Sequence, residues 1–262
     1  MSRFCPLFSS SDGNCIYAGT ADAAILIDAG VACRNIIAAL VSRDVDPSTI
    51  KAVAITHGHS DHTSGLRAVL NKLKVPVIAT ATTLSYLKEH ALIPENAKTI
   101  TADGEVEVAG IRLSAFCTSH DCAGSCGYRI ALPDGRHVAV CTDLGYISDE
   151  IENALCGCDL VMIESNHDVN MLKKNPNYPF PLKERILSDC GHLSNGQCSS
   201  FLPKLIKGGT TRIILAHLSM QNNLPAVALT TARACLTEAG FREELDYILY
   251  VAPRQGGKMF IL

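Results

Sequence analysis

Several short apolar runs in this sequence end in a side chain that can bind a metal ion or carry a proton. Asp143, Glu164 and His217 each stand at or just after the end of a run typical of a buried strand. Asp28 and His57 hold the same position after two earlier runs. An ionised side chain there is costly unless it is paired or metal-bound. Because the strand ends of an α/β fold gather at one edge, the pattern predicts a single site there.

Strands and helices are mixed along the whole chain, which predicts an α/β layered fold. We expect strands over residues 15–20, 23–30, 51–56, 75–79, 105–110, 111–117, 125–132, 136–142, 159–165 and 212–219, and two more near the end. We expect helices over residues 34–44, 65–73, 83–92, 149–155, 226–240 and, interrupted near Pro203, 196–208. No stretch rich in Pro, Gly or Ser divides the chain, and 47% of its residues are apolar, enough for one sizeable core. We therefore expect a single domain, residues 1–262.

The string THGHSDHTSGL holds the densest group of metal-ligand side chains. His57, His59, Asp61 and His62 fall within six residues, at the corner between a buried strand and a helix. Gly58 is expected to let this loop turn tightly. Four such side chains at the mouth of a strand can face two neighbouring metal positions. A solvated polar loop is the alternative, and it leaves this combination unexplained.

HGHSDH resembles the second motif of the metallo-β-lactamase superfamily, and the other motifs stand in the family's order. Asp28 in LIDAG is similar to the first motif and His120 in TSHDC to the third. Asp143 in CTDLGY is similar to the fourth and His217 in LAHLS to the fifth. Asp121, beside His120, is the alternative there. The resemblance implies a four-layer αββα sandwich with the active site at the strand ends between two sheets.

The same resemblance implies two divalent metal ions per chain, zinc or else manganese or iron. The implied ligands are His57, His59 and His120 for one metal, Asp61, His62 and His217 for the other, and Asp143 as the bridge between both. Asp28 would support the metal loop from behind, although Asp before Ala-Gly is also common turn chemistry.

Glu164 and His192 resemble the proton-relay pair in the phosphodiesterase and nuclease branches of the superfamily. A histidine oriented by a carboxylate can protonate a leaving alkoxide near neutral pH. With Asp61 they form our set of candidate catalytic residues. A helix-capping or structural role is the alternative for His192, which stands in GHLSN before a helix. His167, three residues beyond Glu164, is a candidate substrate contact.

Longer strings are similar to the YycJ/WalJ family of bacterial metallo-hydrolases. They include SSSDGN near the start, TSHDCAGSCGYRI, ESNHDVNML, and YPFPLKERI leading into GHLSN. Members of that family are regarded as double-stranded DNA exonucleases that work from 5′ ends. The resemblance therefore implies a DNA partner, whereas the residues by themselves indicate only metal-dependent hydrolysis.

Three alternatives to a DNA exonuclease stay open. Enzymes of tRNA 3′ processing usually carry a long arm, often between the third and fourth motifs, but only 22 residues separate His120 from Asp143. A small phosphodiester such as a cyclic phosphate could also be the substrate, whereas the Glu164 and His192 pair argues against a thioester or lactam. A non-catalytic metal-binding regulator is the third alternative, and the intact ligand set disfavours it.

Residues 171–185, MLKKNPNYPFPLKER, are expected to form a proline-stiffened loop without secondary structure. Tyr178 and Phe180 lie there among cations, a combination that suits phosphates and exposed bases, although a solvated loop is an equal alternative. The candidate contacts are Lys173, Lys174, Lys183 and Arg185. The net charge of −3 argues against a generally basic coat, and two divalent ions would change it to +1 (−3 + 4).

The chain has twelve cysteines, which we expect to be mostly buried, reduced thiols. A structural zinc built from Cys117, Cys122 and Cys126, or from Cys156 and Cys158, is the alternative, but neither spacing matches a zinc ribbon. The N-terminus lacks a basic region followed by a long apolar stretch, and no run is long enough to cross a bilayer. We therefore expect a cytoplasmic protein without a membrane partner.

Overall fold

The computed structural model covers all 262 residues, and the chain forms two compact units. Unit 1 comprises Met1–Ala115, Cys122–Arg136 and Pro253–Leu262, and unit 2 comprises Phe116–Asp121 and His137–Ala252. Each unit is thus assembled from segments that are not consecutive in sequence. The expectation of one domain over the whole chain stays a prediction. None of the helices has both the length and the apolar character needed to cross a membrane.

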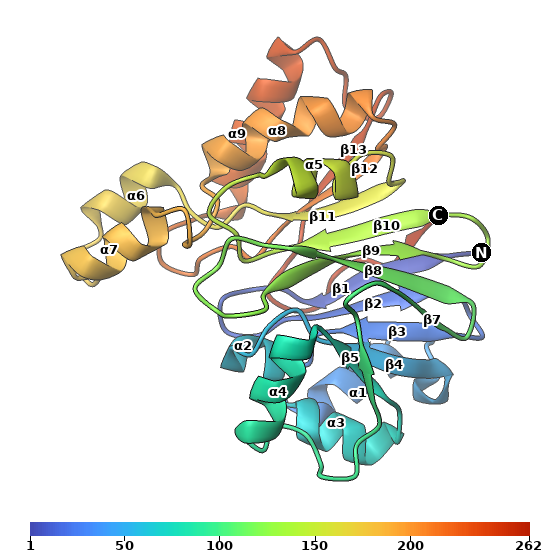
Figure 1. Ribbon diagram of the computed structural model, residues 1–262. Helices are drawn as coiled ribbons and strands as arrows, with labels where there is room; N and C mark the ends of the chain where they lie inside the picture. The colour runs from blue at the N-terminus through green and yellow to red at the C-terminus, as the bar shows by residue number, and fades with distance from the viewer. The chain divides into compact units, whose positions relative to one another are not determined.

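Unit 1 contains a mixed seven-stranded sheet in the order β14-β1-β2-β3-β4-β5-β6 (Figure 1). Its strands are β1 (Arg3–Phe8), β2 (Cys15–Gly19), β3 (Ala24–Ile27), β4 (Ile50–Ala54), β5 (Val77–Ala79), β6 (Thr99–Thr101) and β14 (Phe260–Ile261). The strands from β3 to β6 are parallel, and β14, β1 and β2 join them in antiparallel fashion. The sequence analysis missed β1, which carries Pro6 beside a register shift, and the three-residue β6.

The helices of unit 1 cover one face of this sheet (Figure 1). They are α1 (Cys33–Val41), a 3-10 turn η1 (Pro47–Thr49), α2 (Ser60–Thr63), α3 (Leu66–Leu73) and α4 (Ala81–Glu89). Ile36 and Leu40 of α1 and Val69 of α3 are buried with Leu26 and Val53 of the sheet in one apolar cluster. Burial of each such side chain is worth about 1.5–3 kcal/mol, so the helices hold the sheet, and the loops at its strand ends, in place.

Three more strands belong wholly or mostly to unit 1: β7 (Glu105–Val108), β8 (Ile111–Cys117) and β9 (Cys126–Ala131). They are consecutive neighbours, and β7 pairs with β8 in antiparallel fashion, with Val108 opposite Ile111. The two residues between them, Ala109 and Gly110, both have positive φ. A two-residue loop of this kind is the turn that matches the natural twist of a hairpin.

Unit 2 is built on parallel strands that lie side by side in the order β13-β12-β11-β10. They are β10 (His137–Cys141), β11 (Leu160–Glu164), β12 (Arg212–Ala216) and β13 (Ile248–Val251). Its helices are α5 (Asp149–Leu155), α6 (Val169–Lys174), α7 (Phe180–Leu187), α8 (Asn195–Lys207) and α9 (Pro225–Glu238). Side chains of α5, α8 and α9 form one buried cluster with the inner strands. In Figure 1, α6 and α7 stand apart from the other helices of the unit.

Two expectations about the second half of the chain are wrong. Residues 171–185 are not a loop, because α6 and α7 occupy most of the segment. Asp168 starts α6 by accepting the Met171 N–H at 2.8 Å, and Pro179 and Pro181 stand at the start of α7, where a missing N–H costs nothing. Helix α8 is not interrupted near Pro203 either, since it continues to Lys207 with Leu202 and Leu205 buried on its inner face.

Candidate metal centre

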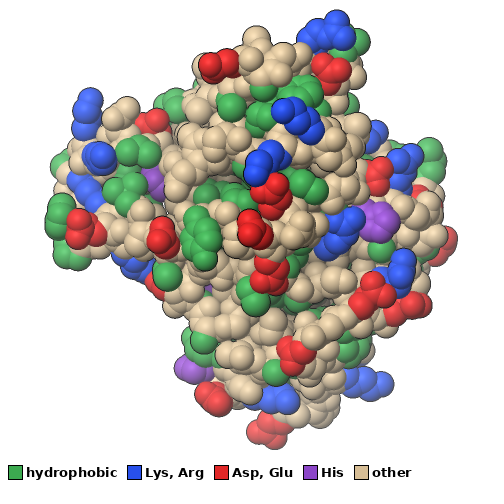
Figure 2. Space-filling model, turned by 45° about the horizontal axis from the view of Figure 1, so that its top comes forward, with side chains coloured by type: hydrophobic (Ala, Val, Ile, Leu, Met, Phe, Trp, Pro, Cys, Tyr) green, Lys and Arg blue, Asp and Glu red, His purple; other side chains and the backbone are tan.

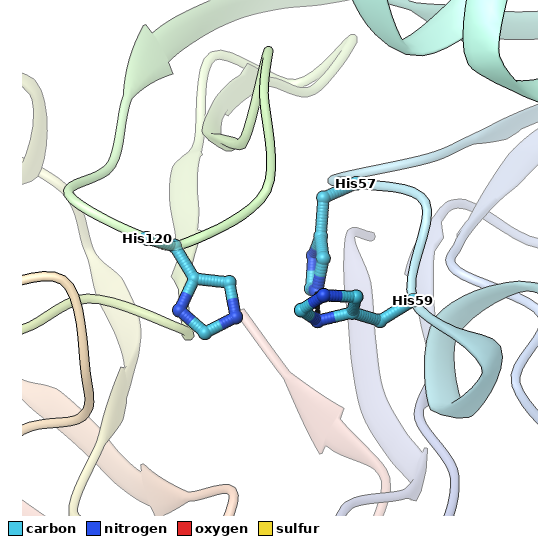
Figure 3. Close-up of side chains that lie close together, drawn as sticks. All are labelled: His57, His59 and His120. Carbon is cyan, nitrogen blue, oxygen red and sulfur yellow. Dashed lines mark hydrogen bonds between the residues drawn. The ribbon is translucent and has the colours of Figure 1, made fainter. Parts of the chain in front are cut away.

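The unit 1 part of the candidate site begins on the loop that leaves β4. Figure 3 shows His57 and His59 on this loop with their rings close together. His57 Nε2 lies 3.1 Å from His59 Nδ1, and the ring planes are 79° apart. The two imidazoles of His57 and His59 thus meet edge to face, with one nitrogen of each close to the other. Two histidine ligands of the same metal ion are placed in this way.

Gly58, between these two histidines, has a different role from the one expected. Its φ lies outside the left-handed range, so the loop does not need glycine for a tight turn. A Cβ at this position would come within 2.4 Å of the Tyr86 ring. Gly58 is therefore required because Tyr86 packs closely against the loop between β4 and α2. We call this loop, together with α2, the metal loop.

Asp61 and His62 lie in α2, the short helix directly after this loop. His62 Nδ1 is 2.7 Å from Oδ2 of the buried Asp28, and His62 Nε2 lies 3.3 Å from Asp61 Oδ2. A carboxylate that holds Nδ1 of a histidine presents Nε2 as the ligating nitrogen. Asp28 is fixed in turn, because its Oδ1 accepts the Thr56 N–H at 2.9 Å.

Three supporting residues of unit 1 were missed by the sequence analysis. The Thr56 hydroxyl contacts both Asp28 and His57 Nδ1. Asn14 donates its backbone N–H to the Asp61 carbonyl at 2.8 Å, and its side chain lies 3.2 Å from His62 Nε2. Gly30 packs so closely that a Cβ there would reach 1.6 Å from that same carbonyl oxygen. Asn14 is the last residue of the string SSSDGN, and nothing in the neighbouring sequence indicates that it supports His62.

The unit 2 part of the candidate site lies at the carboxyl ends of β10, β11 and β12. Ligand atoms of Asp143, Glu164, His192 and His217 all lie within 4.8 Å of one another. The parallel register explains this, since Glu164 is directly opposite Ala216, the residue before His217. All but His192 are buried. The grouping agrees with the expectation that ligand-type residues at strand ends lie together.

Three candidate site residues adopt a left-handed backbone conformation although none is glycine. Asp28 has a φ of 62°, Asp143 of 61° and His217 of 55°. Each follows a strand end, where the chain must turn sharply while its side chain stays aimed at the edge of the sheet. The conformation costs about 1–2 kcal/mol per residue. Such strain concentrates at functional sites, where the surrounding structure holds it in place.

Glu164 is the most heavily hydrogen-bonded carboxylate of the candidate site. Its Oε1 lies 2.7 Å from His217 Nδ1 and 3.0 Å from His192 Nδ1. Its Oε2 accepts the Leu193 N–H at 2.9 Å. Burial raises the pKa of Glu164, but His192, by charge and hydrogen bond, and His217 outweigh it and lower the pKa to about 2. Glu164 is therefore ionised and orients two histidines rather than one.

His192 and His120 lie close together, with ring centroids 5.2 Å apart, but their environments differ. Burial lowers the pKa of His192, yet the charge and hydrogen bond of Glu164 outweigh it, so that the pKa is raised. For His120, which follows β8 (Figure 3), burial dominates and lowers the pKa. His120 Nε2 lies 3.3 Å from Asp121 Oδ1 and 3.9 Å from Asp143 Oδ1. A raised pKa suits a proton donor, and a lowered pKa suits a neutral ligand.

His167 is 1% exposed, and neither of its ring nitrogens has a hydrogen-bond partner. Its backbone is fixed, since its carbonyl accepts the Asn195 N–H at 2.8 Å. Burial lowers the pKa of His167 to about 4. The ring is therefore neutral at physiological pH, and two unsatisfied nitrogens in a buried position call for a polar partner.

The candidate substrate cations lie on α6 and α7. Lys173 and Lys174 are exposed at the end of α6, and Lys183 Nζ donates to the Lys173 carbonyl at 2.9 Å. Arg185 forms an ion pair with Asp121.

None of the twelve cysteines forms a disulfide. No cysteine belongs to any group of side chains placed to hold a metal, so the structure offers no site for the alternative of a cysteine-bound zinc.

The chain is similar to known metallo-hydrolases over most of its length. A sequence model of the beta-lactamase superfamily domain matches residues 23–218. An exodeoxyribonuclease YycJ from Bacillus anthracis is 36% identical over 242 residues, covering 91% of this chain and 90% of that protein. An exodeoxyribonuclease WalJ from Streptococcus pneumoniae serotype 2 is 31% identical over 252 residues, covering 95% and 93%. Both relatives are thus named as enzymes that cleave phosphodiester bonds.

A solved structure supports the fold. The metallo-beta-lactamase fold protein YhfI from Bacillus subtilis aligns with 99% of this chain and 98% of its own, with a TM-score of 0.72 at 14% identity. The metallo-β-lactamase fold class expected from the sequence is therefore confirmed.

Proposed function

Because this chain belongs to the metallo-β-lactamase superfamily and is homologous to YycJ and WalJ over more than 90% of its length, we propose that it is a metal-dependent DNA exonuclease. We propose further that it degrades double-stranded DNA from 5′ ends. The observation that supports a phosphodiester as the substrate is the contact of His192 with the buried, ionised Glu164. A thioester releases a thiolate, which is a better leaving group than an alkoxide and has less need of such a pair.

The donor set fits divalent metal ions. Two buried carboxylates orient histidines of the site: Asp28 contacts Nδ1 of His62, and Glu164 contacts Nδ1 of His217. In each histidine this leaves Nε2 to bind a metal. Imidazole nitrogens with few carboxylates suit zinc, with manganese or iron as alternatives. We propose two metals, held by His57, His59 and His120, by Asp61, His62 and His217, and by Asp143 as the bridge.

Two such ions, when bound, would lower the pKa of coordinated water towards ~7 and offset charge on the phosphate. The remaining work falls to the chain's own residues. His192 is partly exposed and its pKa is raised by Glu164, which suits it to give a proton to the leaving oxygen. Asp61 is included as a catalytic residue because it lies beside His62 on the metal loop.

DNA as the substrate accounts for the cations of α6 and α7. The proposed phosphate contacts are Lys173, Lys174, Lys183 and Arg185. His167 is proposed as a further substrate contact, because its neutral, unpartnered ring can donate one hydrogen bond and accept another.

The decisive experiment assays metal-loaded protein on end-labelled duplex DNA, single-stranded DNA, RNA and a cyclic nucleotide side by side, with the metal content measured. We expect two metals per chain and degradation of the duplex from 5′ ends. His192→Ala should keep both metals and lose about 10²–10⁴-fold in rate, with a smaller loss on an aryl phosphodiester that needs no proton. Turnover of the cyclic nucleotide alone would contradict the DNA assignment, and no turnover of any substrate would favour a regulator.

A further inference from the structure

The α6–α7 arm, residues 168–191, is the part of unit 2 that is least covered by its neighbours. α7 buries none of its side chains, and α6 buries only Leu172. Figure 1 shows both helices standing apart from α5, α8 and α9. Figure 2 shows green and blue side chains, with some red ones among them, at the left of the view. An exposed apolar surface among cations marks an interaction surface rather than a part of the core.

The foot of this arm is joined to the candidate site. The Gly191 carbonyl lies 3.3 Å from His120 Nδ1, and the next residue is His192. A Cβ at Gly145, two residues after Asp143, would come within 2.2 Å of the Asp189 carbonyl oxygen, so the two loops pack backbone to backbone. The ion pair of Arg185 with Asp121 ties α7 to the loop that carries His120. A partner held by the arm is therefore placed next to the site.

The arm carries Phe180, whose side chain is 70% exposed. It is the first residue of α7 and lies between Pro179 and Pro181, which restrict the backbone on both sides. A large aromatic side chain left in water forgoes the free energy of burial, and a rigid backbone lowers the entropy lost when it is covered. The arm has four cations and three acids, Asp168, Glu184 and Asp189, whereas the whole chain has a net charge of −3.

We propose that Phe180 stacks on the terminal base pair of duplex DNA while Lys173 and Lys174 contact the adjacent phosphates. The inference rests on the proposed exonuclease function and adds how a DNA end is recognised. Only an end exposes the flat face of a base pair, whereas inside a duplex each face is covered by its neighbour. Leu187 lies four residues before Gly191, and the eight residues of α7 from Phe180 to Leu187 span ~12 Å. That is the length of about three to four nucleotides at ~3.4 Å each, so a strand that frays at Phe180 can reach the site.

The first test compares Phe180→Ala with Leu245→Ala, a substitution of a side chain that is also 70% exposed but lies outside the arm. Binding of blunt duplex and of a closed, end-free circular duplex is measured at one salt concentration. Stacking of a base on an aromatic ring corresponds to about 5- to 150-fold in affinity. We expect Phe180→Ala to weaken binding to the open duplex by a factor in this range, and binding to the circle by less than twofold. Leu245→Ala should change neither.

The second test uses the absence of tryptophan from the sequence. Phe180→Trp then introduces the chain's only tryptophan. The variant should retain end binding, and its tryptophan fluorescence should be quenched by blunt duplex whose ends carry non-cleavable phosphorothioates. Phe180→Leu, which keeps the apolar side chain but not the ring, should bind ends as weakly as Phe180→Ala.

Equal affinity of Phe180→Ala and the unmodified protein for open duplex would overturn the proposal, as would an equal loss on open and circular DNA. A change in sedimentation of Phe180→Ala without a change in DNA binding would overturn it too, and would assign the surface to a second copy of the chain. The failure of the exonuclease function is a separate result, because it appears as absent degradation by the unmodified protein.

Discussion

Glu164 shows how one side chain can serve two parts of a site. The sequence analysis paired it with His192 alone, but its Oε1 also contacts His217 Nδ1. Its oxygens accept the backbone N–H groups of Leu193 and, at longer range, of Asp143. Every contact is with a donor, so the position requires an acceptor at both oxygens. The proposed proton donor and a proposed metal ligand are thus oriented by the same carboxylate.

We therefore predict that Glu164→Gln is more harmful than the loss of one orienting contact. The amide places a donor against donors in a buried position, which costs about 1–3 kcal/mol of stability. His217 also loses the charge that holds its Nδ1, so metal content should fall along with activity. Thermal unfolding and elemental analysis of the metal-loaded variant measure both effects. Full metal content with unchanged stability would show that His217 does not depend on Glu164.

The α6–α7 arm shows that composition alone does not predict whether a segment is a helix or a loop. Its three prolines suggested a loop, yet Pro176 lies between the two helices, and Pro179 and Pro181 lie at or beside the start of α7, where proline is tolerated. Lys173 and Lys174 are both exposed in the last turn of α6. An irregular loop would not hold the two charges at a constant spacing, and a helix does.

We predict that the double substitution Lys173→Ala and Lys174→Ala weakens DNA binding equally for all base sequences. Each phosphate contact releases a counterion, so the slope of log affinity against log salt should become shallower by about 2. Fluorescence anisotropy on a duplex over a range of salt concentrations measures the slope. Lys207→Ala, a change at an exposed lysine of α8, serves as the control. A sequence-dependent loss, or an unchanged slope, would argue against phosphate contacts.

The reactivity of each cysteine is expected to depend on how deeply the fold buries it. Cys5, Cys15, Cys141 and Cys198 lie inside the two units, and burial raises their pKa, to about 11 for Cys5. Both the burial and the raised pKa suppress the thiolate that reacts with thiol reagents. A surface cysteine lacks the first of these two protections.

We predict that native protein at pH 8 is modified first at the two exposed cysteines, Cys117 and Cys190. The buried thiols should react only on unfolding, when all twelve become titratable without a reducing agent. Mass spectrometry after timed alkylation identifies the order. Rapid native modification of Cys141 or Cys198 would indicate that unit 2 opens readily, and fewer than twelve thiols in denaturant would indicate disulfides.

Local pattern in the sequence was sufficient for an α/β layered fold and for most elements, whereas the metallo-β-lactamase fold was expected from the resemblance of the motifs. Apolar runs with period-two or helical spacing carry that information, and it depends on near neighbours in the chain. The sequence also placed Asp28, Asp143, Glu164 and His217 at strand ends, since a run of apolar residues that stops at a polar one is visible without coordinates. Short or proline-containing elements such as β1, β6 and α7 were missed, because tertiary packing outweighs weak local preference there.

The sequence by itself determined which residue types stand at the strand ends. Only the tertiary structure decided which of them touch, because parallel register and loop packing join residues far apart in the chain. Glu164 meets His217 across 53 positions, and Asn14 supports His62 across 48. The left-handed backbone at Asp28, Asp143 and His217 was equally invisible, since Asp and His tolerate this conformation without selecting it and only the surrounding fold offsets its cost.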